Sequence, residues 1–129
     1  MQRLTKQDRV DELINHFWKN GYLTLSRRYG TYLPTPKPIG NYRVDAVGKY
    51  KRKYAIGLLL TTEELDSSQV LKKIEYLATR NSRNSQNGTT LFIGVKQNDL
   101  LKAKLIIAEL PDKIKKNLRL VISNNSQTN

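Results

Sequence analysis

The 129-residue chain has no cysteine and one histidine, His16. Disulfides, thiol catalysis and cysteine-bound zinc are therefore excluded, and one imidazole cannot form a histidine-rich metal site. Long apolar runs are also missing. The longest, Ala55–Leu60, is far below the ~18 residues of a membrane-spanning helix, and the first residues lack the apolar stretch of a secretory signal. We therefore expect a soluble, cytoplasmic protein without a membrane partner.

Acidic residues are scarce. The chain has 23 Lys and Arg against 11 Asp and Glu, which gives a formal net charge of +12. This excess favours nucleic acid as the partner, with DNA first, because each neutralised phosphate releases counterions. Between Leu13 and Thr62 the only carboxylate is Asp45. An acid so isolated is typical either of a structural ion pair or of a site that holds a metal near phosphates.

The length fits one domain, which we place at residues 1–123, followed by a disordered polar tail at 124–129. Apolar periodicity predicts a first helix over Lys6–Asn20. Thr5 and Asp8 resemble a capping box at its start, and Gly21 supplies a left-handed stop.

That first helix carries two neighbouring aromatic residues. Phe17 and Trp18 both lie on its apolar stripe, so we expect both to pack onto a sheet. His16 lies off the stripe, which predicts a solvated or capping role.

Strand and loop signals fill most of the remaining chain. Alternating or continuous apolar residues predict five strands, at Tyr22–Leu33, Tyr42–Gly48, Lys53–Leu60, Thr89–Val95 and Asn117–Ile122. Three prolines make residues 34–40 a loop that we expect to be exposed, and Lys49–Arg52 forms a turn.

Two later helices are expected between these strands. The first is capped by Asp66, Ser67 or Ser68 and ends before a polar loop at residues 81–88. The second is capped by Asn98 or Asp99 and stopped by Pro111, with its inward residues at Leu101, Leu105, Ile106 and Leu110. The order α-β-β-β-α-β-α-β predicts an α/β fold of three layers, in which a mixed β-sheet is flanked by helices on both faces.

Three segments resemble the PD-(D/E)XK nuclease superfamily, which includes restriction endonucleases and archaeal Holliday junction resolvases. They are DELINHFWKNGYLTL, which begins at Asp11, YRVDAVGKYKRKYAI, which begins at Tyr42, and LKKIEY at Leu71–Tyr76. The resemblance implies a restriction-endonuclease-like fold. In that family an acidic helix residue, an Asp and a Glu-X-Lys motif hold Mg²⁺ and orient a hydrolytic water.

Only one of those chemical positions is kept. Asp45 matches the family Asp, whereas Gly57, Leu58 and Leu59 stand where Glu-X-Lys is expected, and Val10 stands at the acidic helix position. If the chain is active, the resemblance implies relocated groups: Asp45, Glu63 and Asp11 as metal ligands, and Asp45, Glu63 and Lys53 as catalytic residues, with Lys72 as another candidate for the lysine. Mg²⁺ would then be the cofactor.

Basic residues near tyrosines or prolines, and those at the end of the second predicted helix, are the candidates for nucleic-acid contact, because charge tracks phosphates and rings stack on bases. They are Arg27, Arg28, Lys37, Arg43, Lys49, Lys51, Arg52, Arg80 and Arg83.

The sequence leaves three functions open. The first is a nucleic-acid-binding protein with a nuclease-like fold and a degenerate, inactive site. The alternative is a Mg²⁺-dependent endonuclease or resolvase with relocated acidic ligands. A third is a protein-interaction module that binds a partner at a sheet edge. Members of the resembled family often dimerise, so a homodimer is a further expectation.

Overall fold

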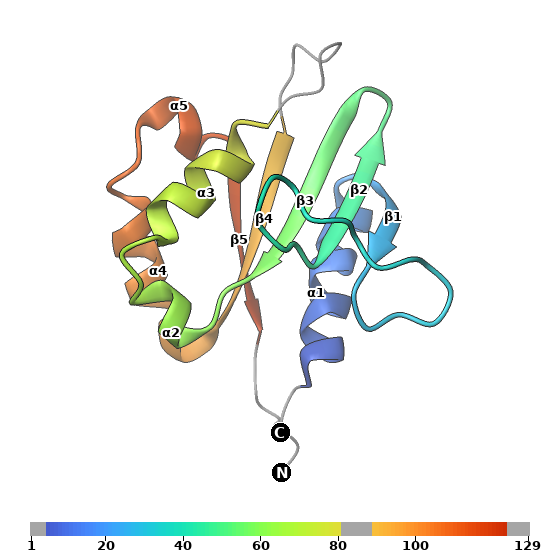
Figure 1. Ribbon diagram of the computed structural model, residues 1–129, viewed down its shortest axis with the longest axis horizontal. Coiled ribbons are helices and arrows are strands. Elements are labelled where there is room, and N and C mark those ends of the chain that lie inside the picture. The colour runs from blue at the N-terminus through green and yellow to red at the C-terminus, as the bar shows by residue number, and fades with distance from the viewer. Residues whose placement is uncertain (1–4, 81–88, 124–129) are drawn as a thin grey trace.

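The computed structural model describes residues 5–80 and 89–123. Its centre is a five-stranded mixed sheet in the order β1-β2-β3-β4-β5 (Figure 1). The first three strands are antiparallel neighbours, whereas β3, β4 and β5 run parallel. The strands are β1 Leu23–Arg27, β2 Ala46–Tyr50, β3 Lys53–Leu59, β4 Thr89–Lys96 and β5 Leu118–Ser123. The expected α/β class with a mixed sheet is confirmed.

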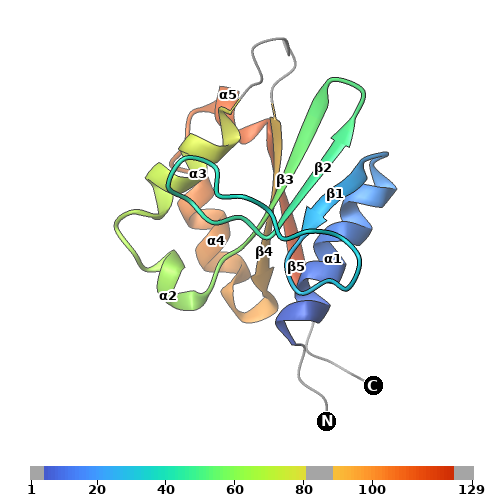
Figure 2. The ribbon, with the colours of Figure 1, turned by 45° about the vertical axis from the view of Figure 1, so that its right-hand side comes forward.

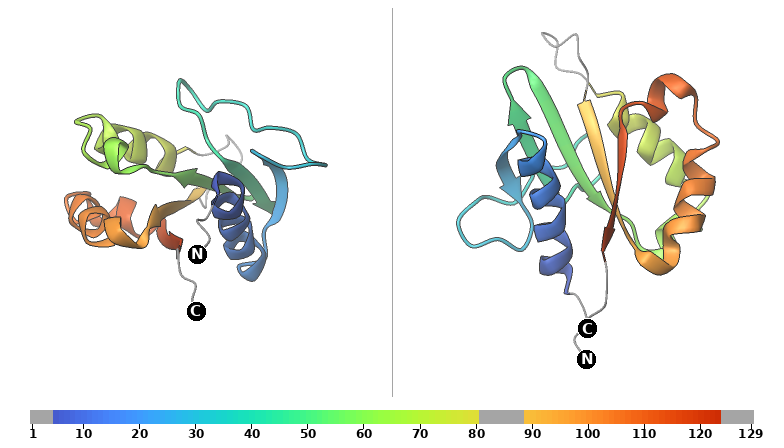
Figure 3. Two further views of the ribbon diagram at one scale, coloured as in Figure 1. Left: turned by 90° about the horizontal axis from the view of Figure 1, so that it is seen from below. Right: turned by 180° about the vertical axis from the view of Figure 1, so that it is seen from behind.

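Helices cover both faces of this sheet, also as expected (Figures 2 and 3). The helix α1 lies alone on one face, and the other helices lie on the opposite face. The helical elements are α1 Lys6–Lys19, α2 Thr62–Leu65, α3 Val70–Ala78, the 3₁₀ turn η1 Gln97–Asp99, α4 Leu100–Ile107 and α5 Asp112–Lys115. The short elements α2, η1 and α5 were not expected from the sequence.

The beginning of α1 confirms the predicted capping box: the Asp8 amide donates to Thr5 Oγ1 and the Thr5 amide to Asp8 Oδ2, each at 3.0 Å. The helix ends at Lys19, and Gly21 follows with a φ of 88°. Phe17 is fully buried, but Trp18 is 72% exposed, so the prediction that both aromatics pack onto the sheet is wrong. Successive helix residues point about 100° apart, and Phe17 takes the inward position.

The connection from β1 to β2 is longer than predicted. The first strand ends at Arg27, and β2 begins only at Ala46, where a strand from Tyr42 was expected. The intervening segment crosses the sheet toward α3 (Figure 1). There the rings of Tyr42 and Tyr76 lie 5.2 Å apart, and Pro36 is buried. The proline-rich loop is thus packed against the domain at these points, although Lys37 is exposed.

Two predictions for the later helices also need correction. The turn that follows β3 forms α2, whose own capping box joins Thr61 and Glu64, while α3 starts at Val70 without a side-chain cap. In α4, Leu101 and Leu105 are 70% and 63% exposed, against the expectation that they point inward. The buried residue of α4 is Ala103, and no described element covers the face that carries Leu101 and Leu105.

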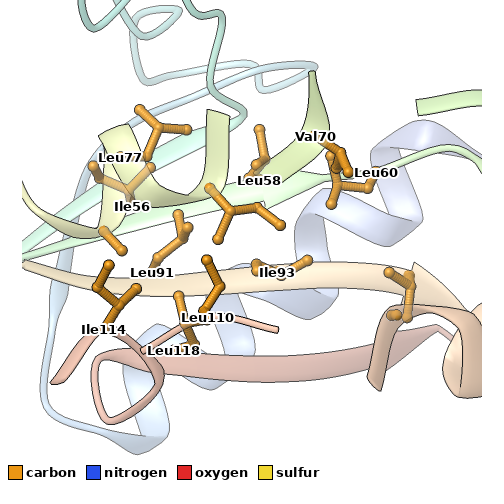
Figure 4. Close-up of a cluster of buried hydrophobic side chains, with 14 of the residues drawn as sticks. Ile56, Leu58, Leu60, Val70, Leu77, Leu91, Ile93, Leu110, Ile114 and Leu118 are labelled. Atoms are coloured by element: carbon orange, nitrogen blue, oxygen red, sulfur yellow. The ribbon is translucent and has the colours of Figure 1, made fainter. Parts of the chain in front are cut away.

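Two apolar cores lie on either side of the sheet. The larger joins β3, β4 and β5 to the helices α2 to α5 (Figure 4), and includes Ile56, Leu58, Ile74, Leu91 and Ile93. The smaller joins the opposite face to α1, and includes Leu13, Phe17, Ala46, Ala55 and Phe92. Burial of these side chains supplies most of the drive to fold, at roughly 25 cal/mol per Å² of apolar surface. The cores fix the start of α1 beside the end of β3.

Candidate nucleic-acid interface and candidate metal site

A pocket of about 200 Å³ opens where the first half of α1, the β1–β2 connection and the end of β3 meet. Most of its lining residues are charged. The lining residues are Lys6, Arg9, Arg28, Tyr29, Arg43, Asp45, Leu58, Leu59, Thr61, Glu64 and Lys73. Five of these eleven are basic and two are acidic. Asp45, the isolated acid of the sequence, is therefore part of a pocket with an excess of positive charge.

Asp45 immediately precedes β2 and is only 5% exposed. Its amide donates to the Gly57 carbonyl at 2.8 Å, and its carbonyl accepts from the Arg28 amide at 2.9 Å. Its carboxylate is also engaged: Oδ2 accepts from the Leu59 amide at 2.8 Å and Oδ1 from Arg28 Nη1 at 3.0 Å. Both oxygens therefore have strong protein donors, as in a structural ion pair.

Besides its hydrogen bond to Asp45, the Arg28 side chain contacts the ring of Tyr29. Its guanidinium carbon lies 4.6 Å from the centre of the Tyr29 ring, a cation–π distance. Tyr29 adopts a left-handed φ of 60°, which is uncommon for a residue with a side chain. The backbone turn thus places the ring and the guanidinium together at the edge of the pocket.

Arg9 is the residue that sequence reasoning missed. It is only 6% exposed, and its Nε and Nη2 atoms have no hydrogen-bond acceptor among the described residues. Burial lowers the pKa of the guanidinium from its ordinary value, and three nearby carboxylates act in the opposite direction. They belong to Asp45, Asp99 and Glu64. The sequence contained a signal for this burial, because Arg9 lies one helical turn before Leu13 on the apolar face of α1.

Glu64 and Lys73 form the far wall. Lys73 Nζ lies 3.2 Å from Glu64 Oε2, and the Thr61 amide donates to Glu64 Oε1 at 3.0 Å. Burial alone would raise the pKa of Glu64, but the Thr61 amide and the charge of Lys73 outweigh it and hold that pKa below its ordinary value. Glu64 is therefore an ionised partner of Lys73.

Three bases of the pocket remain without an ion-pair partner among residues 5–80 and 89–123. They are Lys6, Arg9 and Arg43. Lys6 and Arg43 are exposed at the mouth, and Arg9 is buried in the wall. The pocket therefore has positive charge available for an anion after its internal pairs are counted.

The relocated metal ligands considered from the resemblance are not brought together. Asp11 lies 2.7 Å from Arg27 Nη1, and Glu63 is exposed on α2 and does not line the pocket. Lys53 pairs with Tyr50 at the far end of the β2–β3 hairpin, and Lys72 is exposed beside the pocket-lining Lys73. Within residues 5–80 and 89–123, no three His, Asp or Glu side chains form a group suited to a metal ion.

The two positions at which the resemblance expects acidic groups, Gly57 and Val10, are surrounded by packed side chains. A Cβ added at Gly57 would lie 3.1 Å from Leu13 Cδ1 and 3.2 Å from Ala46 Cβ, so α1 occupies the space that a longer side chain needs. Val10 is fully buried. A glutamate at Gly57 would therefore crowd the side chains of α1.

The residues predicted to contact nucleic acid fall into separate groups. Arg28 and Arg43 line the pocket, and Arg27 pairs with Asp11. Arg80 stacks on the Tyr76 ring at 4.0 Å, Lys37 is exposed in the β1–β2 connection, and Arg83 lies outside the described residues.

Lys49, Lys51 and Arg52 are exposed at the tip of the β2–β3 hairpin. The ammonium groups of Lys49 and Lys51 each lie 5.3 Å from a tyrosine ring, that of Tyr54 and Tyr50 respectively. This tip begins at the last residues of β2, whereas the pocket-lining Asp45 precedes its first residue, so the tip and the pocket lie at opposite ends of the strand. A strand of this length spans roughly 17 Å, so one extended polyanion could reach both.

Comparison of the chain with models of protein families, with curated proteins and with solved structures gives no match. Among the helices that the structure describes, none has the length and apolar character required to cross a bilayer.

Proposed function

We propose that this chain binds nucleic acid, DNA in the first place, and that it has a fold like that of PD-(D/E)XK nucleases without their metal-dependent catalysis. The fold part is supported by the topology: a helix, three antiparallel strands, and a helical crossover to a parallel fourth strand. In this arrangement Asp45 lies beside the end of β3, which corresponds to the strand that carries the Glu-X-Lys motif in the resembled family.

One observation carries the proposal. The carboxylate of Asp45 is bound by Arg28 and by the Leu59 amide, inside a pocket with five basic and two acidic residues. Mg²⁺ takes ordered oxygen ligands and is reluctant to lose its waters. A single carboxylate that already accepts two strong hydrogen bonds is a poor ligand for it, whereas the surrounding bases favour phosphate.

Binding is tested by fluorescence anisotropy with labelled duplex, branched and single-stranded DNA, and with RNA of the same sequences. We expect binding that does not require Mg²⁺ and weakens on the order of a hundredfold between about 50 and 200 mM salt, as for about four phosphate contacts. No binding to any of these probes at low salt would refute the proposal. Mg²⁺- or Mn²⁺-dependent cleavage that Asp45→Ala abolishes would instead favour the endonuclease.

A further inference from the structure

The unsatisfied nitrogens of Arg9 are an adjacent pair. The N–H groups of Nε and Nη2 point in nearly parallel directions along one edge of the planar guanidinium. This edge is one of the two that bind a carboxylate or phosphate through paired hydrogen bonds. In this structure both nitrogens lack an acceptor among the described residues, although Arg9 is 6% exposed and lines the pocket. A buried donor without an acceptor is unfavourable, because it loses its hydrogen bonds to water without replacement.

The carboxylates nearest to Arg9 do not satisfy this edge. Asp45 is bound by Arg28 and the Leu59 amide, and Glu64 by Lys73 and the Thr61 amide. The third, Asp99, accepts from Thr62 Oγ1 at 2.7 Å. They reduce the electrostatic cost of burying the guanidinium but give it no hydrogen bond.

We infer that the pocket binds a phosphate monoester, as found at a phosphorylated nucleic-acid end, through the paired N–H groups of Arg9 with Lys6 and Arg43 at its mouth. This inference deepens the proposed function and rests on it. The terminal group carries about −1.5 to −2 charges near pH 7, against one for an internal phosphodiester. Three bases without ion-pair partners therefore favour the terminal group over an internal one.

The pocket geometry agrees with an end rather than a continuous strand. Its walls come from α1, the β1–β2 connection, β3 and the segment from Thr61 to Lys73, so it is bounded on several sides. A volume of about 200 Å³ is sufficient for a terminal phosphate group. Both Arg9 nitrogens lie beneath the accessible surface, so binding includes a small rotation of this side chain toward the pocket.

The test compares one labelled DNA duplex in three forms, with a 5′-phosphate, with a 3′-phosphate, or with hydroxyl groups at all ends. Anisotropy with the full chain at constant ionic strength should give affinity for at least one phosphorylated form on the order of tenfold above the hydroxyl form. Inorganic phosphate should compete more effectively than chloride. Equal affinity for all three forms would overturn the inference and leave the proposed function intact, whereas no binding to any form would remove both.

The decisive variant is Arg9→Lys, which keeps the charge and removes the paired donors. It should lose the preference for the phosphorylated end while still binding the hydroxyl form. Arg119→Lys, on the edge strand β5, is the matched control and should keep the preference. If Arg9→Lys does not fold, Arg43→Gln provides the test at an exposed position, with a several-fold smaller preference expected. An unchanged preference in either pocket variant would assign Arg9 or Arg43 a structural role only.

Discussion

Arg28 Nη1 donates to Asp45 Oδ1 at 3.0 Å, and the Asp45 side chain is 7% exposed. This pair joins the end of β1 to the start of β2 and directs the only carboxylate between Leu13 and Thr62 toward a protein cation. The same carboxylate accepts from the Leu59 amide. Asp45 therefore connects three segments around the pocket and is first of all a structural residue.

Asp45→Ala should accordingly reduce the free energy of unfolding by about 2–3 kcal/mol. A fully buried pair broken on one side costs ~3–5 kcal/mol, but Arg28 is 25% exposed and regains some hydration. Urea denaturation measures the change. Asp45→Asn keeps an acceptor for the Leu59 amide and should cost less than alanine. A loss below about 0.5 kcal/mol, the range of surface substitutions, would contradict this role.

Placing a glutamate at position 57, where the resemblance to PD-(D/E)XK nucleases expects one, should not create a nuclease. In Gly57→Glu the new Cβ would lie 3.1 Å from Leu13 Cδ1 and 3.2 Å from Ala46 Cβ, and a carboxylate would be buried against α1. We expect loss of cooperative unfolding, measured by circular dichroism. Gly57→Ala is the control for steric crowding alone and should cost about 1–3 kcal/mol. A folded, Mg²⁺-dependent Gly57→Glu enzyme would contradict our description of this position.

The sequence predicted the boundaries of a helix well where those boundaries depend only on neighbouring residues. Thr5 and Asp8 identified the start of α1, and Gly21 its end, because capping depends on neighbouring residues. Trp18 and Leu105 were misplaced because an apolar residue beside the buried stripe is buried only if another element covers it, which a local pattern does not show.

The site was predictable only in part for the same reason. Asp45 could be selected from its isolation in the sequence, but its partners Arg28 and Leu59 are brought to it by the pairing of separate strands. The buried Arg9 was overlooked because a charge on an apolar stripe is rare. The candidate ligand Glu63 is exposed, because the chain turns into α2 at Thr62, and Glu64 lines the pocket instead.

The pair of Glu64 and Lys73 should make stability depend on pH in acid. The folded state lowers the pKa of Glu64 below its ordinary value of 4.5. A lowered carboxyl pKa stabilises the protein above the unfolded pKa, and this contribution disappears as the pH falls through the folded pKa. Glu64→Gln should therefore be less stable than the wild type at neutral pH.

The two stability curves should converge as the pH falls below about 4.5, which urea unfolding at a series of pH values measures. The effect should be modest, because the Glu64 side chain is 41% exposed and solvent screens the pair. Glu63→Gln, which removes an exposed carboxylate from the same helix, controls for the change in net charge. A constant difference between Glu64→Gln and the wild type across this range would contradict the prediction.

The basic tip of the β2–β3 hairpin should contribute to the salt dependence of DNA binding. Lys49, Lys51 and Arg52 are exposed there beside Tyr50, and each phosphate contact adds about 0.9 to the slope of log affinity against log salt. Changing all three to glutamine should lower that slope by about 2–3 and weaken hydroxyl-ended and phosphorylated DNA equally.

The matched control changes three lysines at another surface, Lys113, Lys115 and Lys116 at α5, to glutamine. It removes the same charge from the protein as a whole. If the slope depends on contact at the hairpin, the control should keep it near the wild-type value, whereas a purely long-range effect of the net charge of +12 would lower it equally in both variants. An equal reduction would therefore remove the hairpin from the interface and leave the pocket as its proposed centre.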